Sequence, residues 1–74
     1  MNILEHIRQI SKKLNLKSSE KEYRYYIIVQ SNKVEMILVK SNKNLVSELG
    51  YFHNEEDCKM IINKYQKELL ECIV

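Results

Sequence analysis

The chain has 74 residues, of which 45% are hydrophobic, and its formal net charge is only +2. A chain of this length forms one domain with a thin core, because it buries only about 60% of the surface that its unfolded form exposes. With no proline, one glycine and this hydrophobic content, the composition excludes a disordered chain or a flexible linker, and the small net charge gives no argument for a nucleic-acid partner.

The sequence predicts a cytoplasmic protein. No apolar run approaches the ~20 residues of a membrane span, and the opening MNILEHIRQI carries Glu5 and His6 where a signal peptide needs an unbroken apolar stretch. Cys58 and Cys72 are expected on one helix, about 21 Å apart, whereas a disulfide needs Cα atoms within about 7 Å. We therefore expect both cysteines to be small core residues in a reducing compartment.

The charges are distributed unevenly along the chain. Residues 1–43 contain nine Lys/Arg and four Asp/Glu, a net charge of +5, and residues 44–74 contain three and six, a net charge of −3. The sequence therefore predicts a dipolar molecule with a basic front half and an acidic back half.

A first amphipathic helix is predicted over residues 2–14. Its apolar residues recur at intervals of 4, 3 and 4 positions: Ile3, Ile7, Ile10 and Leu14. Asn2 is a suitable N-cap, and the polar residues 15–22 are predicted to form the following loop.

Three strands are predicted next, over residues 23–30, 33–40 and 45–52. The segments YRYYIIVQ and VEMILVK are rich in aromatic and β-branched residues, and Ser31 and Asn32 between them favour a tight turn. We expect the third strand to complete a meander, with Gly50 as a bulge or a point of close backbone approach.

A second helix is predicted over residues 55–73. Its apolar residues keep helical spacing: Cys58, Ile61, Ile62, Tyr65, Leu69, Cys72 and Ile73. Asn54 is placed as the N-cap, and the acids at 55–57 stabilise the positive end of the helix. The predicted fold is α+β: one domain, residues 1–74, with a helix, a three-stranded antiparallel meander and a helix.

A two-residue hairpin loop fixes which strand residues share a face. It pairs Val29 with Val34, Ile27 with Met36 and Tyr25 with Leu38 on one face. The other face is also mostly apolar, and it carries Arg24, Tyr26, Ile28, Glu35, Ile37 and Val39. Two arrangements stay open: one helix on each face, or both helices on one face with the second face contacting a partner.

The sequence contains no pattern typical of an enzyme, a metal site or a cofactor site. His53 precedes three consecutive acids, but adjacent helical residues point about 100° apart and cannot converge on one ion. The single glycine, Gly50, excludes a glycine-rich phosphate loop. No nucleophilic triad is indicated, and so small a chain is expected to have little room for a pocket of ~300 Å³ or more.

The segment LGYFHNEEDCKMIINKY, residues 49–65, resembles a family pattern. It is similar to the DNA-binding domain of plant ethylene-response factors and to the arm-site domains of tyrosine recombinases, through Leu49, Gly50, Tyr51, Phe52, Glu56 and Cys58. Cys58 stands where the family usually has alanine. The resemblance covers under a quarter of the chain and implies a three-stranded sheet packed on a helix. In that family, arginines and tryptophans on the exposed sheet face recognise DNA. The corresponding face of this sequence is too apolar to neutralise phosphates.

The opening MNILEHIRQI is similar to that of small type II anti-CRISPR proteins. The shared residues are Met1, Asn2, Ile3, Ile7, Arg8 and Ile10. This resemblance implies a compact phage product with a helix–sheet–helix fold, although the basic front half departs from the acidic, DNA-mimicking members.

Three functions follow as hypotheses. The first is a non-catalytic phage or mobile-element inhibitor that occludes a host nucleic-acid-processing or defence protein, such as a CRISPR nuclease complex. Tyrosine and arginine are frequent interface anchors, and the expected partner-binding residues are Arg24, Tyr26, Ile28, Ile37 and Val39. The second is a DNA- or RNA-binding protein whose phosphate contacts would come from Lys12, Lys13, Lys17, Lys21, Arg24, Lys33, Lys40 and Lys43. The third is a homodimer that buries the sheet face or the C-terminal LLECIV.

Overall fold

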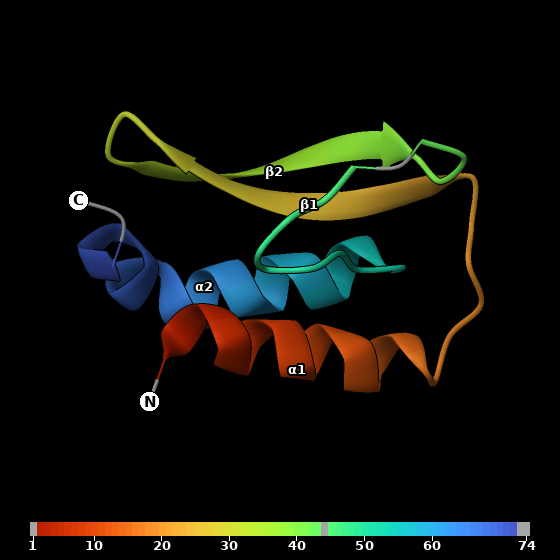
Figure 1. Ribbon diagram of the computed structural model, residues 1–74, viewed down its shortest axis with the longest axis horizontal. Helices are drawn as coiled ribbons and strands as arrows, with labels where there is room; N and C mark the ends of the chain where they lie inside the picture. The colour runs from red at the N-terminus through yellow and green to blue at the C-terminus, as the bar shows by residue number, and fades with distance from the viewer. Residues whose placement is uncertain (1, 44, 73–74) are drawn as a thin grey trace.

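The computed structural model describes residues 2–43 and 45–72. Its elements are, in order, α1 (Ile3–Asn15), β1 (Tyr23–Gln30), β2 (Lys33–Lys40) and α2 (Glu55–Cys72). The two strands form an antiparallel hairpin, α2 packs against both strands, and α1 packs against α2. Both helices therefore lie on the same side of the hairpin (Figure 1). Of the two arrangements left open by the sequence, this is the one in which the second sheet face has no helix.

Helix α1 forms where the apolar periodicity predicts it. The Leu4 N–H donates to Oδ1 of Asn2 at 3.0 Å, so Asn2 is the N-cap as expected. Ile7 is fully buried, and Ile3, Ile10 and Leu14 pack against the core.

The hairpin has the predicted register. Ser31 and Asn32 both adopt positive φ, 51° and 60°, as the two central residues of a type I′ turn must. This turn fixes the ladder from Gln30 opposite Lys33 to Tyr23 opposite Lys40. Every cross-strand pair expected from the sequence is confirmed.

The prediction of a third strand over residues 45–52, and with it the three-stranded meander, is wrong. The described residues form two strands, and Phe52 alone joins them through an isolated bridge to Tyr25. Phe52 lies beside the outer edge of β1, whereas a meander would place it beside β2. The fold is still a small α+β domain.

A turn prevents residues 45–51 from extending as a strand. The Gly50 N–H donates to the Ser47 C=O at 3.1 Å, and the Leu49 N–H donates to the Ser47 hydroxyl at 3.3 Å. Gly50 has a φ of +77°, which favours glycine, and a Cβ there would lie 2.7 Å from the Ser11 hydroxyl. The close backbone approach expected at Gly50 is confirmed, and its partner is α1.

The core lies between α2 and the helix-side face of the hairpin. Its fully or nearly buried members are Ile7, Ile27, Leu49, Phe52, Cys58, Ile61 and Leu69. Cys58 is a core residue as predicted, but the prediction for Cys72 is wrong because its side chain is exposed. Ile73, expected in the second helix, falls outside the described residues.

Asn54 precedes α2, but its side chain does not cap the helix as expected. Its Oδ1 accepts a hydrogen bond from Lys21 Nζ at 2.5 Å, and its Nδ2 donates to Asp57 Oδ2 at 3.3 Å. The acids Glu55, Glu56 and Asp57 do occupy the first turn, where the helix dipole favours negative charge.

Candidate functional site

The sheet face that points away from the helices is the first candidate site, and we call it the open face. It carries Arg24, Tyr26, Ile28, Ile37 and Val39, the five residues expected from the sequence to bind a partner. Ile28, Ile37 and Val39 are partly exposed, since no described helix packs against this side. The hairpin thus brings three aliphatic side chains together on a surface without helix cover (Figure 1).

Tyr26 does not belong to the exposed part of the open face. Its side chain is 1% exposed, its hydroxyl donates to the Leu45 C=O at 3.4 Å, and its ring centroid lies 5.9 Å from that of Tyr51. The chain's own segment 45–51 covers it. Tyr26 therefore anchors this segment to the sheet and is not accessible to a partner.

Arg24 is held in place by two neighbours. It forms an ion pair with Glu20, to which its Nε donates at 2.6 Å, and its guanidinium lies 4.2 Å from the centroid of the Tyr51 ring. Burial lowers the pKa of Arg24, but the hydrogen bond with Glu20 and other nearby groups outweigh it, so the pKa is raised. The side chain stays charged, and its planar group is already stacked.

The sequence reasoning missed two exposed apolar residues beside the open face. Leu45 and Val46 belong to the segment that covers Tyr26, and Val46 is 95% exposed. They were expected inside the third strand. One feature of the sequence does indicate that this segment is not a strand. LVSELG lacks the strict apolar–polar alternation that a half-buried strand needs.

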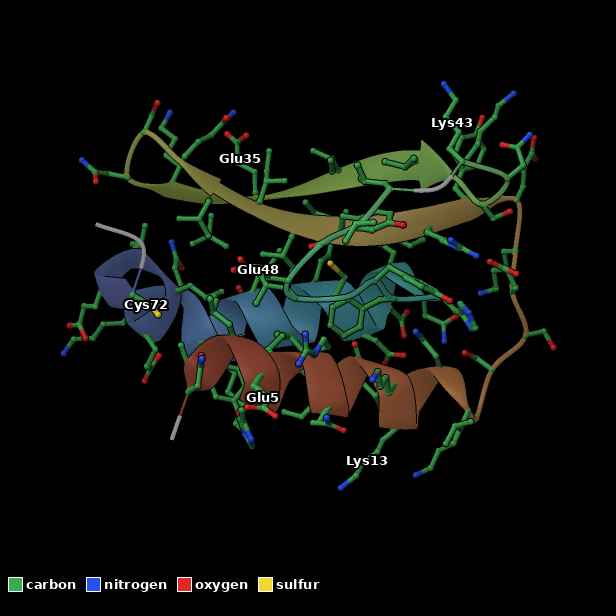
Figure 2. All side chains as sticks on the ribbon, in the orientation of Figure 1. Glu5, Lys13, Glu35, Lys43, Glu48 and Cys72 are labelled. Atoms are coloured by element: carbon green, nitrogen blue, oxygen red, sulfur yellow. The ribbon has the colours of Figure 1, made fainter. Side chains whose placement is uncertain are left out.

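The lysines of the nucleic-acid hypothesis are distributed unevenly over the molecule. Lys33 and Lys40 lie at opposite ends of β2, about 23 Å apart at ~3.3 Å per residue. Lys43 lies at the strand layer and Lys13 projects from α1 on the other side of the molecule (Figure 2). Lys12 is on α1, Lys17 follows it, and Lys21 bonds Asn54. Lys33 is therefore far from Lys40, whereas Lys21 and Lys40 each adjoin the contact between Glu22 and Ser41, whose main chains bond at 2.9 Å.

A groove between α1 and the segment 50–53 is the second candidate site. Its volume is about 580 Å³, so the expectation that the chain has little room for a ligand is wrong. Most of the lining surface is apolar, and the residues that line it are Arg8, Ser11, Lys12, Asn15, Leu16, Gly50, Tyr51 and His53.

Hydrogen bonds hold the two walls of this groove together. Asn15 on α1 donates from Nδ2 to the Tyr51 C=O at 2.8 Å and accepts from the His53 N–H at 3.0 Å. His53 is 8% exposed, and its Nδ1 lies 3.0 Å from the Ser18 hydroxyl. His53 is therefore a positioned wall residue whose ring contacts Tyr51 at a centroid distance of 5.7 Å.

The groove contains two cations without carboxylate partners. Among residues 2–43 and 45–72, neither Arg8 nor Lys12 takes part in an ion pair. Nε of Arg8 is buried and has no hydrogen-bond partner within that same part of the chain. An unpaired buried donor is unfavourable, but a buried atom is not itself open to a ligand in the groove, so the charge of the groove comes from the two side chains as a whole.

The remaining reactive side chains are separated. His6 contacts Tyr65, with Nε2 3.2 Å from the tyrosine hydroxyl, far along the chain from His53. Burial, together with the charge of Glu55, raises the pKa of Cys58 to about 12, so its thiol stays protonated. In the described ranges no cluster of three or more His, Cys, Asp or Glu side chains is arranged to hold a metal ion.

No protein-family model matches the chain, and no curated protein or solved structure matches it either. The resemblances of residues 1–10 and 49–58 therefore stay predictions. Within the described chain, neither helix combines the length and apolar character needed to cross a membrane.

Proposed function

We propose that the protein is a non-catalytic binding protein that contacts a partner protein through the open face. The observation that carries the proposal is the placement of both helices on one side of the hairpin. It leaves Ile28, Ile37 and Val39 partly exposed on the other side, although aliphatic side chains on a sheet normally pack against a second layer.

The surroundings of these three residues support the same proposal. Leu45, whose C=O accepts from the Tyr26 hydroxyl, and the next residue, Val46, are also exposed apolar residues, while Gln30, Lys33 and Glu35 lie on the same face near the hairpin turn. An apolar centre with a polar rim is the usual composition of a protein–protein interface. Arg24, already stacked on Tyr51, adds a charged group with little side-chain entropy left to lose on binding.

The partner class that we propose is a nucleic-acid-processing or defence protein of a bacterial host, which the small domain would occlude. The similarity of residues 1–10 to anti-CRISPR proteins suggests this class. Of the shared residues, Asn2 caps α1, and Ile3, Ile7 and Ile10 face the core, so four of the similarities concern the fold. The inhibitor class is thus a narrower proposal than partner binding.

A pair of matched variants tests partner binding. Ile37→Ser with Val39→Ser removes apolar surface from the open face, and Leu38→Ser, between them in β2, is the control. Leu38 is 53% exposed but points to the helix side. The tagged proteins would capture partners from host lysate, with and without nuclease treatment, and mass spectrometry would identify them. We expect the wild type and Leu38→Ser to capture the same protein and the double variant to lose it while keeping its circular dichroism spectrum.

Retention of that protein by a folded double variant would contradict binding through the open face. Loss of it after nuclease treatment would indicate a nucleic-acid-mediated contact instead. The inhibitor class has its own test, in which a type II CRISPR nuclease cleaves a target DNA in the presence of the protein. We expect cleavage to be inhibited by the wild type and by Leu38→Ser only, and unchanged cleavage would contradict this class.

A second candidate function is homodimerisation, and the observation that favours it is the outer edge of β2. Among the described residues, no strand or bridge pairs with this edge. An unpaired edge strand presents backbone donors and acceptors to another strand. A second copy would extend the hairpin to a four-stranded sheet across a twofold axis.

A further inference from the structure

We propose that the groove between α1 and the segment 50–53 is a binding site for a small carboxylate with an apolar body. The proposal concerns a site other than the open face, although Tyr51 of the groove contacts Arg24 of that face, and it rests on three observations. These are the shape of the groove, the fixed position of its walls, and the two cations at its surface.

The first wall is one face of α1. Arg8, Ser11, Lys12 and Asn15 follow each other at helical spacing, so their side chains project from the same face. The second wall is formed by Gly50, Tyr51 and His53. Gly50 permits the close approach of the two walls, because a Cβ at this position would meet the Ser11 hydroxyl at 2.7 Å.

The walls are already fixed without a ligand. Asn15 bonds the backbone of both Tyr51 and His53, and the ring of Tyr51 contacts both Arg24 and His53. A preformed site loses little conformational entropy on binding. The groove volume of about 580 Å³ is in the range of small-molecule sites, and its mostly apolar lining suits an aromatic or aliphatic body.

The charge of the ligand follows from Arg8 and Lys12. Neither forms an ion pair within the described residues. The exposed Lys12 ammonium and the Arg8 side chain line the same groove, so a carboxylate bound there would lie beside both charges, and charge-assisted hydrogen bonds are stronger than neutral ones. The groove offers one guanidinium and one ammonium, and this small positive charge matches the charge of a single carboxylate better than that of a polyanion.

Two carboxylates of the chain lie near Arg8 and would oppose the ligand. Glu5 and Glu48 line a neighbouring hollow together with Arg8, and Figure 2 shows them on the same side of the molecule. Neither is paired with Arg8 in the described part of the structure. Their charge lowers the affinity for an anion, so Glu48→Gln should strengthen binding.

The test is a titration of the full-length ¹⁵N-labelled protein followed by NMR. The probe is phenylacetate, and its matched control is the neutral phenylacetamide, which has the same ring and nearly the same size. We expect phenylacetate to shift the amide signals of Ser11, Lys12, Gly50 and Tyr51 saturably, with a Kd in the millimolar range that is usual for so small a ligand. Phenylacetamide should bind about tenfold more weakly or worse, since it lacks the charge.

Variants identify the groups that bind the probe. Arg8→Gln and Lys12→Gln should each weaken phenylacetate binding several-fold, and Lys13→Gln should leave it unchanged. Lys13 is the adjacent cation in the same turn but does not line the groove. Lys12 is exposed, so its replacement tests the site even if Arg8→Gln is unstable.

Three results would overturn the proposal. Equal affinity for the charged and neutral probes would contradict the role of the cations. Shifts confined to the open face, or the absence of saturable shifts at concentrations of about 10 mM, would contradict the location.

Discussion

The main chains of Tyr25 and Phe52 exchange two hydrogen bonds. The Tyr25 N–H donates to the Phe52 C=O at 2.9 Å, and the Phe52 N–H donates to the Tyr25 C=O at 2.8 Å. Both polar groups of Tyr25 thus point away from β2. In an antiparallel pair the inward- and outward-pointing residues alternate, so Leu38, which lies opposite Tyr25, points its own N–H and C=O away from β1.

This relationship separates the two edges of the hairpin. The edge of β1 is partly covered by Phe52 at Tyr25. By the same alternation, Val34, Met36 and Leu38 direct their backbone groups outward from β2, and no backbone hydrogen bond reaches them within the described residues. The two edges therefore differ in their capacity to accept another strand.

The first prediction concerns dimerisation through this edge. Proline at position 38 removes an N–H that β1 does not use, so Leu38→Pro should spare the hairpin and block pairing with another strand. We expect light scattering to show a concentration-dependent dimer for the wild type and for Leu38→Ser, and a monomer for Leu38→Pro. A wild type that stays monomeric at about 1 mM would rule out the homodimer.

The hairpin and the helices could be predicted from the sequence because local features determine them. The turn at Ser31 and Asn32 fixes the register, and every pair of the ladder follows from it. The helices follow from apolar periodicity and, for α1, from the cap at Asn2.

The segment 45–51 could not be predicted because distant contacts determine its path. Leu45 and Val46 have strand-forming side chains, yet the segment turns at Gly50 to pass close to Ser11 of α1. The alternation of side chains along β1 places Tyr26 and Ile28 on the same face, so the sequence predicts that both are exposed there. Only the folded chain shows that segment 45–51 covers Tyr26. The groove depends on the same contacts, because Arg8 and Tyr51 meet only through tertiary packing.

The second prediction concerns Gly50. Gly50→Ala places a Cβ 2.7 Å from the Ser11 hydroxyl at a φ of +77°, so it introduces both a steric contact and backbone strain. We expect the free energy of unfolding to fall by about 1–3 kcal/mol in urea titrations. In the Ser11→Ala background the loss should be smaller but not absent, since only the contact is relieved. An unchanged stability of Gly50→Ala would show that this segment does not pack against α1 as described.

The third prediction separates the structural role of Tyr26 from partner binding. Tyr26→Ser should lower the free energy of unfolding by about 3–5 kcal/mol, because it leaves a cavity at a fully buried ring. Tyr26→Phe removes only the hydroxyl, whose bond to the Leu45 C=O is long at 3.4 Å, and should cost about 0.5–1 kcal/mol. We also expect Tyr26→Phe to keep the partner captured by the wild type. Loss of that partner by folded Tyr26→Phe would place Tyr26 in the interface.

The fourth prediction concerns the two thiols. Cys72 is exposed and Cys58 is buried, with its pKa raised to about 12, so a thiol reagent such as DTNB should modify one cysteine quickly in the folded protein and the second only after unfolding. Cys72→Ser should abolish the fast reaction. A fast reaction that persists in this variant would contradict the burial of Cys58.

The same pKa predicts how stability depends on pH. In the unfolded chain the thiol ionises near the ordinary value of 9.0, whereas in the folded protein it stays protonated up to about 12. Between these values the unfolded state binds fewer protons, so the contribution of Cys58 is fully present below pH 9 and decreases as the pH rises towards 12. Urea titrations at pH 8 and about 10.5 should therefore show a larger loss for the wild type than for Cys58→Ala, which has no thiol to titrate. All other groups are the same in both proteins, so the difference between the two losses measures Cys58, and equal losses would contradict its raised pKa.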